Sequence, residues 1–224
     1  DRQIDNIMGR DIFEEQGDSM SWYYAEYAKF KCLHAMRRFS HQLDDDLLKR
    51  LIQSDSPVIL EIGANDGTDT LRFASLFPTA RIYAFEPDPR AVEVFRSKVN
   101  NPNVFLFDTV LSDVEGEVEF YQSSGTPPDA VEGEEWHRSG SIKAPKEHLS
   151  TFPWCKFEKK IVVKSTTLDN WRKREGIENV DFIWCDVQWA ELNVIRGGIE
   201  TLQKHTRYFY TEYYQNEMYD NNAT

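Results

Sequence analysis

Short apolar runs alternate with amphipathic segments along most of the chain. The apolar runs are 57–63 (PVILEIG), 80–87 (ARIYAFEP), 103–108 (NVFLFD), 180–186 (VDFIWCD) and 207–214 (RYFYTEYY). Nearly continuous apolar runs of this length are typical of parallel strands buried on both faces. Segments with helical patterning are 68–77, 89–99, 168–175 and 190–203. Because alternating strands and helices close as a parallel sheet with right-handed crossovers, the pattern predicts a doubly wound α/β domain.

Two more helices are predicted before the first strand, at Ser19–Phe39 and Asp44–Gln53. The length of 224 residues fits one domain with a small appendage. We therefore divide the chain into an N-terminal helical extension, residues 1–54, and a domain built on a mostly parallel central sheet, residues 55–224.

The middle of the chain is less regular. Residues 117–122 and 159–166 alternate like strands, whereas Ser123–Thr151 between them is rich in Gly, Pro, Ser and charged residues. A loop of this length inside a compact domain is usually functional or disordered. It is therefore a candidate binding segment.

Composition narrows the classes of partner. The chain has 26 Lys and Arg against 38 Asp and Glu, and its net charge of −12 repels a phosphate backbone. Nucleic acid is therefore not expected as a substrate. Four lysines come closest to a basic patch, and we interpret them as the solvated face of a strand: Lys156, Lys159, Lys160 and Lys164.

The cysteines are too widely spaced for a common site. Cys32, Cys155 and Cys185 form no CxxC pair and have no histidine pattern beside them, so we expect neither a disulfide framework nor a bound metal. No apolar run is long enough to span a bilayer and no signal peptide is visible, so we expect a cytoplasmic protein. The sequence does not indicate an oligomeric state.

A glycine motif, EIGANDG at 61–67, follows the first predicted strand and opens a predicted helix. Gly63 permits a tight turn, and Gly67 lets the backbone come close to a ligand or to the sheet. A plain strand-to-helix turn remains an equal alternative on the glycines alone. Nineteen residues beyond Gly67, Glu86 ends the second strand, where a carboxylate can hold ribose hydroxyls.

This geometry serves both dinucleotides and S-adenosylmethionine, so charge decides between them. A pyrophosphate needs bare backbone donors at a helix N-terminus, whereas this turn carries Glu61, Asp66 and Asp69. The ammonium and sulfonium of S-adenosylmethionine are cations that carboxylates attract. An NAD-dependent oxidoreductase or epimerase is the first alternative, although neither an uncharged phosphate loop nor a tyrosine–lysine pair is clear.

Five blocks in order, EIGANDG, AFEPDP, VLSDVEGEVEF, TTLDNW and VDFIWCDVQWAELNVIRGG, resemble the FkbM-type methyltransferases over about residues 57–212. The resemblance implies a Rossmann-like methyltransferase fold and S-adenosylmethionine as cofactor. It commonly implies O-methylation of a hydroxyl on a sugar or other small molecule. Such a sheet normally continues with a further hairpin, so we expect the sequence to be truncated at its C-terminus.

The resemblance also implies site residues. The expected cofactor-binding set is Glu61, Gly63, Ala64, Asn65, Gly67, Glu86, Pro87, Asp108, Ser112, Asp113 and Asp186. Asp108, Ser112 and Asp113 would lie near the adenine, and a turn in which Ser112 and Asp113 satisfy local backbone groups is an equal alternative. The catalytic candidates are Asp186 and Glu212, either of which could accept the hydroxyl proton or orient the acceptor. Helix capping is the alternative role of Asp186.

One block departs from the family. FkbM-type sequences usually read Asp-Val-Glu-Gly-Ala-Glu, whereas this chain has Gln188 and Trp189 in place of Glu-Gly. An amide cannot act as a base and is a poor metal ligand, so no such role transfers to Gln188. This departure leaves a non-catalytic, methyltransferase-like module as the second alternative.

Aromatic residues suggest where the acceptor binds. We expect Ser123–Thr151 and the aromatic segment Trp22–Phe30 to form the acceptor side. We also expect three rings to converge there, those of Trp136, Trp154 and Trp189, because aromatic faces suit sugar rings. Packing of these rings against the sheet is an equal alternative. The expected substrate-binding residues are Trp189, Glu191 and His137, for a saccharide or small-molecule acceptor.

Overall fold

A five-stranded parallel sheet forms the centre of the protein. The computed structural model describes residues 43–128, 130, 135–212 and 218–220. The strand order is β3-β2-β1-β7-β8, and every neighbouring pair is parallel. The strands are β1 (Val58–Ile62), β2 (Arg81–Phe85), β3 (Val104–Phe107), β7 (Phe182–Cys185) and β8 (Phe209–Thr211). The predicted doubly wound α/β class is therefore confirmed.

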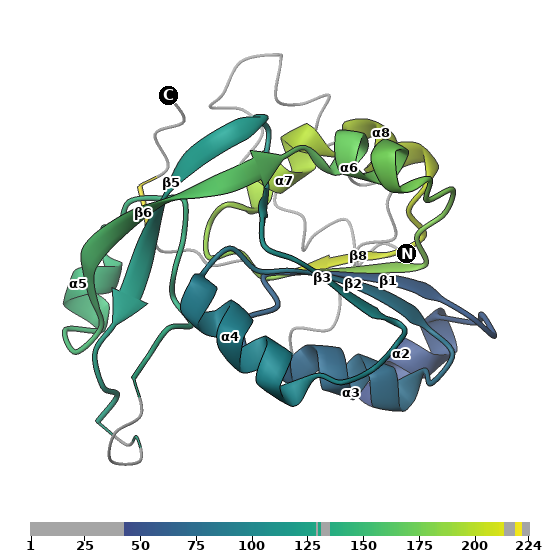
Figure 1. Ribbon diagram of the computed structural model, residues 1–224, viewed down its shortest axis with the longest axis horizontal. Coiled ribbons are helices and arrows are strands. Elements are labelled where there is room, and N and C mark those ends of the chain that lie inside the picture. Colours follow the sequence, from purple (N-terminus) through teal and green to yellow (C-terminus); the bar gives the residue numbers. More distant parts are fainter. Residues whose placement is uncertain (1–42, 129, 131–134, 213–217, 221–224) are drawn as a thin grey trace, which may run out of the picture.

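Helices cover both faces of this sheet (Figure 1). One face carries α2 (Asp45–Leu51), α3 (Thr68–Leu76) and α4 (Pro89–Lys98). The other carries α6 (Leu168–Glu175), α7 (Glu191–Gly197) and α8 (Ile199–Lys204). All five residues of β1 are buried, which explains why the strand reads as a continuous apolar run.

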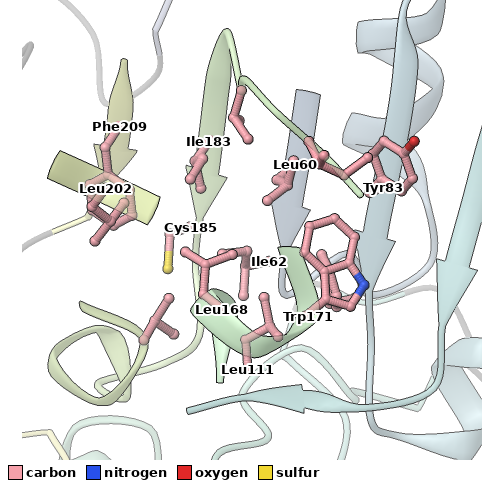
Figure 2. Close-up of a cluster of buried hydrophobic side chains, with 14 of the residues drawn as sticks. Leu60, Ile62, Tyr83, Leu111, Leu168, Trp171, Ile183, Cys185, Leu202 and Phe209 are labelled. Atoms are coloured by element: carbon pink, nitrogen blue, oxygen red, sulfur yellow. The ribbon is translucent and has the colours of Figure 1, made fainter. Parts of the chain in front are cut away.

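Two hydrophobic clusters fill the layers above and below the sheet. Leu60 and Ile62 of β1 face Leu168 and Trp171 of α6 in the first cluster (Figure 2). Ile59 points to the opposite face, as the alternation of side chains along a strand requires. There it packs in the cluster that contains Leu48 of α2. The described part of the predicted N-terminal extension thus shares its core with the sheet.

A second, three-stranded sheet has the order β4-β6-β5. Its strands are β4 (Val110–Leu111), β5 (Gly116–Ser124) and β6 (Lys156–Thr166), and β5 and β6 form an antiparallel ribbon to one side of the main sheet (Figure 1). The four lysines of β6 have exposed side chains. Lys160 forms an ion pair with Glu119 at 3.3 Å, as expected for a solvated face.

The prediction of a single helix over residues 190–203 was wrong in one respect. The segment forms two helices that are separated at Gly198. A Cβ atom on Gly197 would lie 1.9 Å from the carbonyl oxygen of Ser112, and one on Gly198 would lie 2.7 Å from the side chain of Leu168. The glycine pair therefore lets the chain pack closely against its neighbours at the cost of helical continuity. The short helix α5 (His148–Thr151) lies at the end of Ser123–Thr151, which was predicted to be a loop.

Some predictions concern residues that the structure does not describe. The predicted helix at Ser19–Phe39, with its aromatic segment Trp22–Phe30 and Cys32, lies outside the described residues. Cys155 and Cys185 are buried and form no disulfide. Among the described residues, no helix is both long and apolar enough to cross a membrane.

The packing of α2 can be tested with two leucines. Leu48 is fully buried, so Leu48→Ala should lower the free energy of unfolding by about 3 kcal/mol through lost burial and the cavity left behind. The matched control is Leu71→Ala on α3, where the side chain is 41% exposed and the loss should stay below about 1 kcal/mol. Urea titration measures both. Equal losses would mean that α2 is not part of the core.

Candidate active site

A cavity of about 450 Å³ opens where the central strands end. The residues at the carboxyl ends of three strands line it: Ile62 and Gly63 at the end of β1, Phe85 and Glu86 at the end of β2, and Asp186 and Val187 after β7. The chain runs from β1 to β2 on one side and returns to β7 on the other. The cavity therefore lies at the topological switch point, where open α/β sheets bind their ligands.

The turn after β1 is held by the end of β2. The N–H groups of Gly63 and Ala64 both donate to the carbonyl oxygen of Phe85, at 3.0 and 2.9 Å. Gly63 has φ 90°, and a Cβ atom there would lie 1.9 Å from the carbonyl oxygen of Asp186. Only glycine permits this close approach between the turn and the end of β7.

The other glycine of the motif has a packing role. Gly67 begins α3 with φ 79° and does not line the cavity. A Cβ atom there would meet the side chains of Val99 and Phe95. Ala64 and Pro87, also expected in the site, do line the cavity.

Asn65 connects the glycine turn to the long loop. It lines the cavity in a left-handed conformation, with φ 45°. Its Nδ2 donates to the carbonyl oxygen of His137 at 3.1 Å. Its Oδ1 is buried and has no hydrogen-bond partner among the described residues. Because buried polar atoms are normally paired, this oxygen is suited to a ligand donor.

Glu86 is buried and anchored by backbone groups. Its Oε2 accepts from the N–H of Asn65 at 2.8 Å, and its Oε1 accepts from the N–H of Asp88 at 2.7 Å. Burial raises the pKa of Glu86 to about 7, although these two hydrogen bonds oppose the rise. A carboxylate has about four acceptor positions, so the anchored group can still accept from ligand hydroxyls.

The turn is less negative than its sequence suggests. Burial raises the pKa of Glu61, which accepts a hydrogen bond from the Thr70 hydroxyl. Burial also opposes ionisation of Asp66, but hydrogen bonds from Lys98 and Thr68 outweigh it and lower the pKa of Asp66 to about 2. The ion pair with Lys98, at 2.7 Å, neutralises this carboxylate. The repulsion of a pyrophosphate by three carboxylates is therefore weaker than the sequence analysis assumed.

Asp186 lines the cavity directly after β7. Burial and the nearby Glu212 raise the pKa of Asp186 to about 6, and a hydrogen bond of 2.7 Å from Nε2 of Gln188 opposes the rise. The N-cap of α7 is Ala190, so Asp186 does not cap this helix. Glu212 is close to Asp186 but does not line the cavity.

Glu191 supports the turn after β7 and does not line the cavity. Its Oε1 accepts from the N–H of Val187 at 3.2 Å, and burial raises the pKa of Glu191 to about 7. The structure therefore places this expected substrate residue behind the turn. Its contact with Val187 stabilises the backbone beside Asp186.

Three residues expected near the adenine point away from the cavity. Asp108 pairs with Arg96 at 2.8 Å, the Ser112 hydroxyl lies 3.1 Å from that of Ser165, and Asp113 accepts from Asn193 at 2.7 Å. The residues between them, Thr109, Val110 and Leu111, line the cavity instead. Val110 and Leu111 form β4, which pairs with β6, and the apolar VL between polar neighbours was the available signal.

The long loop supplies one wall of the cavity. His137, Arg138 and Ser141 line it, and Ser141 pairs with Tyr121 of β5 in an isolated β-bridge. Burial lowers the pKa of His137, and its Nδ1 has no partner among the described residues. This part of the loop is where the sequence analysis placed the acceptor.

The three tryptophans expected to converge do not line the cavity. Trp136 and Trp154 pack edge to face at 5.3 Å, and Trp189 is half-buried. A different tryptophan, Trp184 of β7, lines the cavity and stacks on Tyr210 at 4.4 Å. Sequence reasoning missed it because a tryptophan inside a buried strand looks like core.

The described residues contain no group of three His, Cys, Asp or Glu side chains that could hold a metal ion. The cavity is bordered by carboxyl groups, the amides of Asn65 and Gln188, the guanidinium groups of Arg72 and Arg138, and apolar side chains. Such a lining suits an organic ligand with hydroxyl, amine and ring groups.

Comparison with known proteins identifies the family. Residues 61–223 match the family model described as the methyltransferase FkbM domain. This chain belongs to the FkbM methyltransferase family. It is also 44% identical over 171 residues to the 2-O-methyltransferase NoeI of Sinorhizobium fredii (strain NBRC 101917 / NGR234), across 76% of this chain and 68% of that protein. The resemblance seen in the five sequence blocks is confirmed, and the protein is a methyltransferase.

The Asp66 ion pair makes a prediction about stability in this FkbM methyltransferase. A carboxyl whose pKa falls from 3.8 to about 2 on folding stabilises the folded state above pH 4. That stabilisation is lost as pH falls toward about 2. Asp66→Asn should therefore lower the melting temperature at pH 7, and the difference from the wild type should shrink between pH 4 and pH 2. A difference independent of pH would contradict the ion pair.

Proposed function

We propose that this methyltransferase transfers the methyl group of S-adenosylmethionine to a neutral hydroxyl group on a saccharide. The observation that carries the proposal is the position of Glu86 and Asp186 at the switch-point cavity. One carboxylate ends β2 and the other follows β7. A ligand in the cavity therefore meets a hydrogen-bond acceptor on each side of β1.

The lining fits S-adenosylmethionine. Glu86 has acceptor positions left for ribose hydroxyls, and the unpartnered Oδ1 of Asn65 offers another acceptor. Val110 and Leu111 provide an apolar wall for the adenine ring. The carboxylate of Asp186 suits the cationic methionine end. When bound, the cofactor supplies a methyl group that is electrophilic because it is attached to a positively charged sulfur.

Asp186 is the proposed proton acceptor. Its Oδ1 accepts from Nε2 of Gln188, and the acceptor positions that remain on the carboxylate would accept the proton from the acceptor hydroxyl or orient that hydroxyl. With a pKa of about 6, Asp186 is mostly ionised at pH 7. Glu212 does not line the cavity, so its proposed role is to influence Asp186 through charge. The remaining work of the site is to position the two reactants.

Three observations support a neutral sugar acceptor. The relative NoeI is named a 2-O-methyltransferase, which is an activity on a hydroxyl oxygen. The net charge of −12 disfavours anionic acceptors. His137 and Ser141 offer uncharged polar groups on the loop side of the cavity, and Trp184 offers an aromatic ring. Hydroxyl recognition by such groups beside an aromatic face is typical of sugar sites.

Loss of the Glu86 carboxylate tests the cofactor site. Glu86→Ala should weaken S-adenosylmethionine binding tenfold or more, because ribose contacts and the anchor of the Asn65 turn are lost together. Isothermal titration calorimetry measures the affinity, and thermal melting verifies the fold. The matched control is Glu93→Ala on the exposed side of α4, which should bind normally. Unchanged affinity in folded Glu86→Ala would remove Glu86 from the site.

His137 and Trp189 test where the acceptor binds. His137→Ala should raise the KM for the acceptor severalfold and leave S-adenosylmethionine affinity unchanged, because its ring borders the loop side of the cavity. Trp189→Ala is measured in parallel, since that ring lies outside the lining. A loss of acceptor affinity confined to Trp189→Ala would move the acceptor site toward this ring. Acceptor KM values unchanged in both variants would place it elsewhere.

A further inference from the structure

The turn after β7 has an unusual backbone that directs a side chain onto Asp186. Gln188 has φ 53° and Trp189 has φ 74°, so two consecutive residues other than glycine occupy the left-handed region. Such conformations are rare and concentrate where a site requires them. Here the turn brings Nε2 of Gln188 to 2.7 Å from Oδ1 of Asp186.

Gln188 is itself held from the other side. The Ser141 hydroxyl donates to the carbonyl oxygen of Gln188 at 2.6 Å. The buried Tyr219 hydroxyl donates to the carbonyl oxygen of Ser139 at 2.7 Å and lies 3.5 Å from Oε1 of Gln188. A carboxylate accepts only from the NH₂ end of an amide, and a hydroxyl donates only to its oxygen. The single proton of the Tyr219 hydroxyl is donated to Ser139, so the contact with Asp186 specifies the orientation of the Gln188 side chain, with Nε2 toward the carboxylate.

We propose that Gln188 is a positioning residue that keeps the Asp186 carboxylate ionised and turned toward the cavity. The inference rests on the proposed function, in which Asp186 accepts a proton. It gives a role to the residue at which this chain departs from the usual Asp-Val-Glu-Gly-Ala-Glu block. With a glutamate at that position, two carboxylates would face each other across 2.7 Å at neutral pH.

The surroundings of Asp186 explain why a neutral donor matters. The ionisable side chains that face it or share its cavity are Glu61, Asp66, Asp69, Arg72, Glu86, His137, Arg138, Cys185, Glu191, Tyr210, Glu212 and Tyr219. Burial and Glu212 act to protonate Asp186, and Asp69 adds to this effect. In the described part of the chain, the hydrogen bonds that lower the pKa of Asp186 come from the side chain and backbone of Gln188.

Gln188→Met tests the proposal because it keeps the length of the side chain and removes the donor. The acidic limb of kcat/KM against pH should move upward by about one pH unit, since a charge-assisted hydrogen bond is lost. Activity should return to nearly the wild-type value at alkaline pH, where Asp186 is ionised without help. The matched control is Gln203→Met, on the exposed side of α8, whose pH profile should equal that of the wild type. A rate reduced equally at every pH would show a merely structural role and overturn the proposal.

A second measurement does not depend on turnover. The carboxyl ¹³C resonance of Asp186, assigned with Asp186→Asn, reports its titration directly. Its midpoint should rise in Gln188→Met relative to the wild type, and an unchanged midpoint would overturn the proposal. Failure of the proposed function is recognised separately, as absence of S-adenosylmethionine binding or methyl transfer in the wild-type protein.

Discussion

The close approach of three strand ends at the switch point is the constraint on which the site depends. β1 pairs with β2 and β7 at once, and Ile62 is in register with Phe85 and Cys185. The hydrogen bonds continue beyond the strands, from Gly63 to Phe85 and from Asp186 to Ile62. Because a Cβ atom at Gly63 would collide with Asp186, this glycine determines how near the β1 and β7 turns can lie.

The same packing creates the electrostatics. Glu61, Glu86, Asp186 and Glu191 are all removed from solvent at one end of the sheet, and burial raises the pKa of each. A buried carboxylate is costly unless donors stabilise it, and here the donors are backbone N–H groups, a hydroxyl and an amide. Clusters of carboxyls with raised pKa values are characteristic of functional sites, where ligands complete the balance. The desolvation of these carboxyl groups thus destabilises the folded protein locally, at the end of the sheet where the cavity lies.

The loop between β5 and β6 supplies one wall of the cavity. Asn65 holds His137, Ser141 holds Gln188, and Tyr219 holds Ser139. Each of these contacts joins a residue of the loop to a segment far away in the sequence. The loop and the turns at the strand ends are therefore linked by hydrogen bonds, although they come from different parts of the chain. Through Ser141, the loop holds the backbone of Gln188, whose side chain donates a hydrogen bond to Asp186.

The local sequence pattern was enough to predict the strands of the main sheet, because burial on both faces requires a nearly continuous apolar run. It also predicted that Glu86 ends the second strand, because a polar residue marks the end of such a run. It was also enough to predict that EIGANDG connects a strand to a helix. It could not predict the break at Gly197–Gly198, because helical spacing continues across it and the reason for the break lies in Ser112 and Leu168. Nor could it predict which side chains face the cavity beyond the strand ends: Asp108 turns to Arg96, Asp66 is neutralised by Lys98, and Gln188 turns back to Asp186. Those directions follow from contacts between segments far apart along the chain, so they exist only once the strands, helices and loop have packed together.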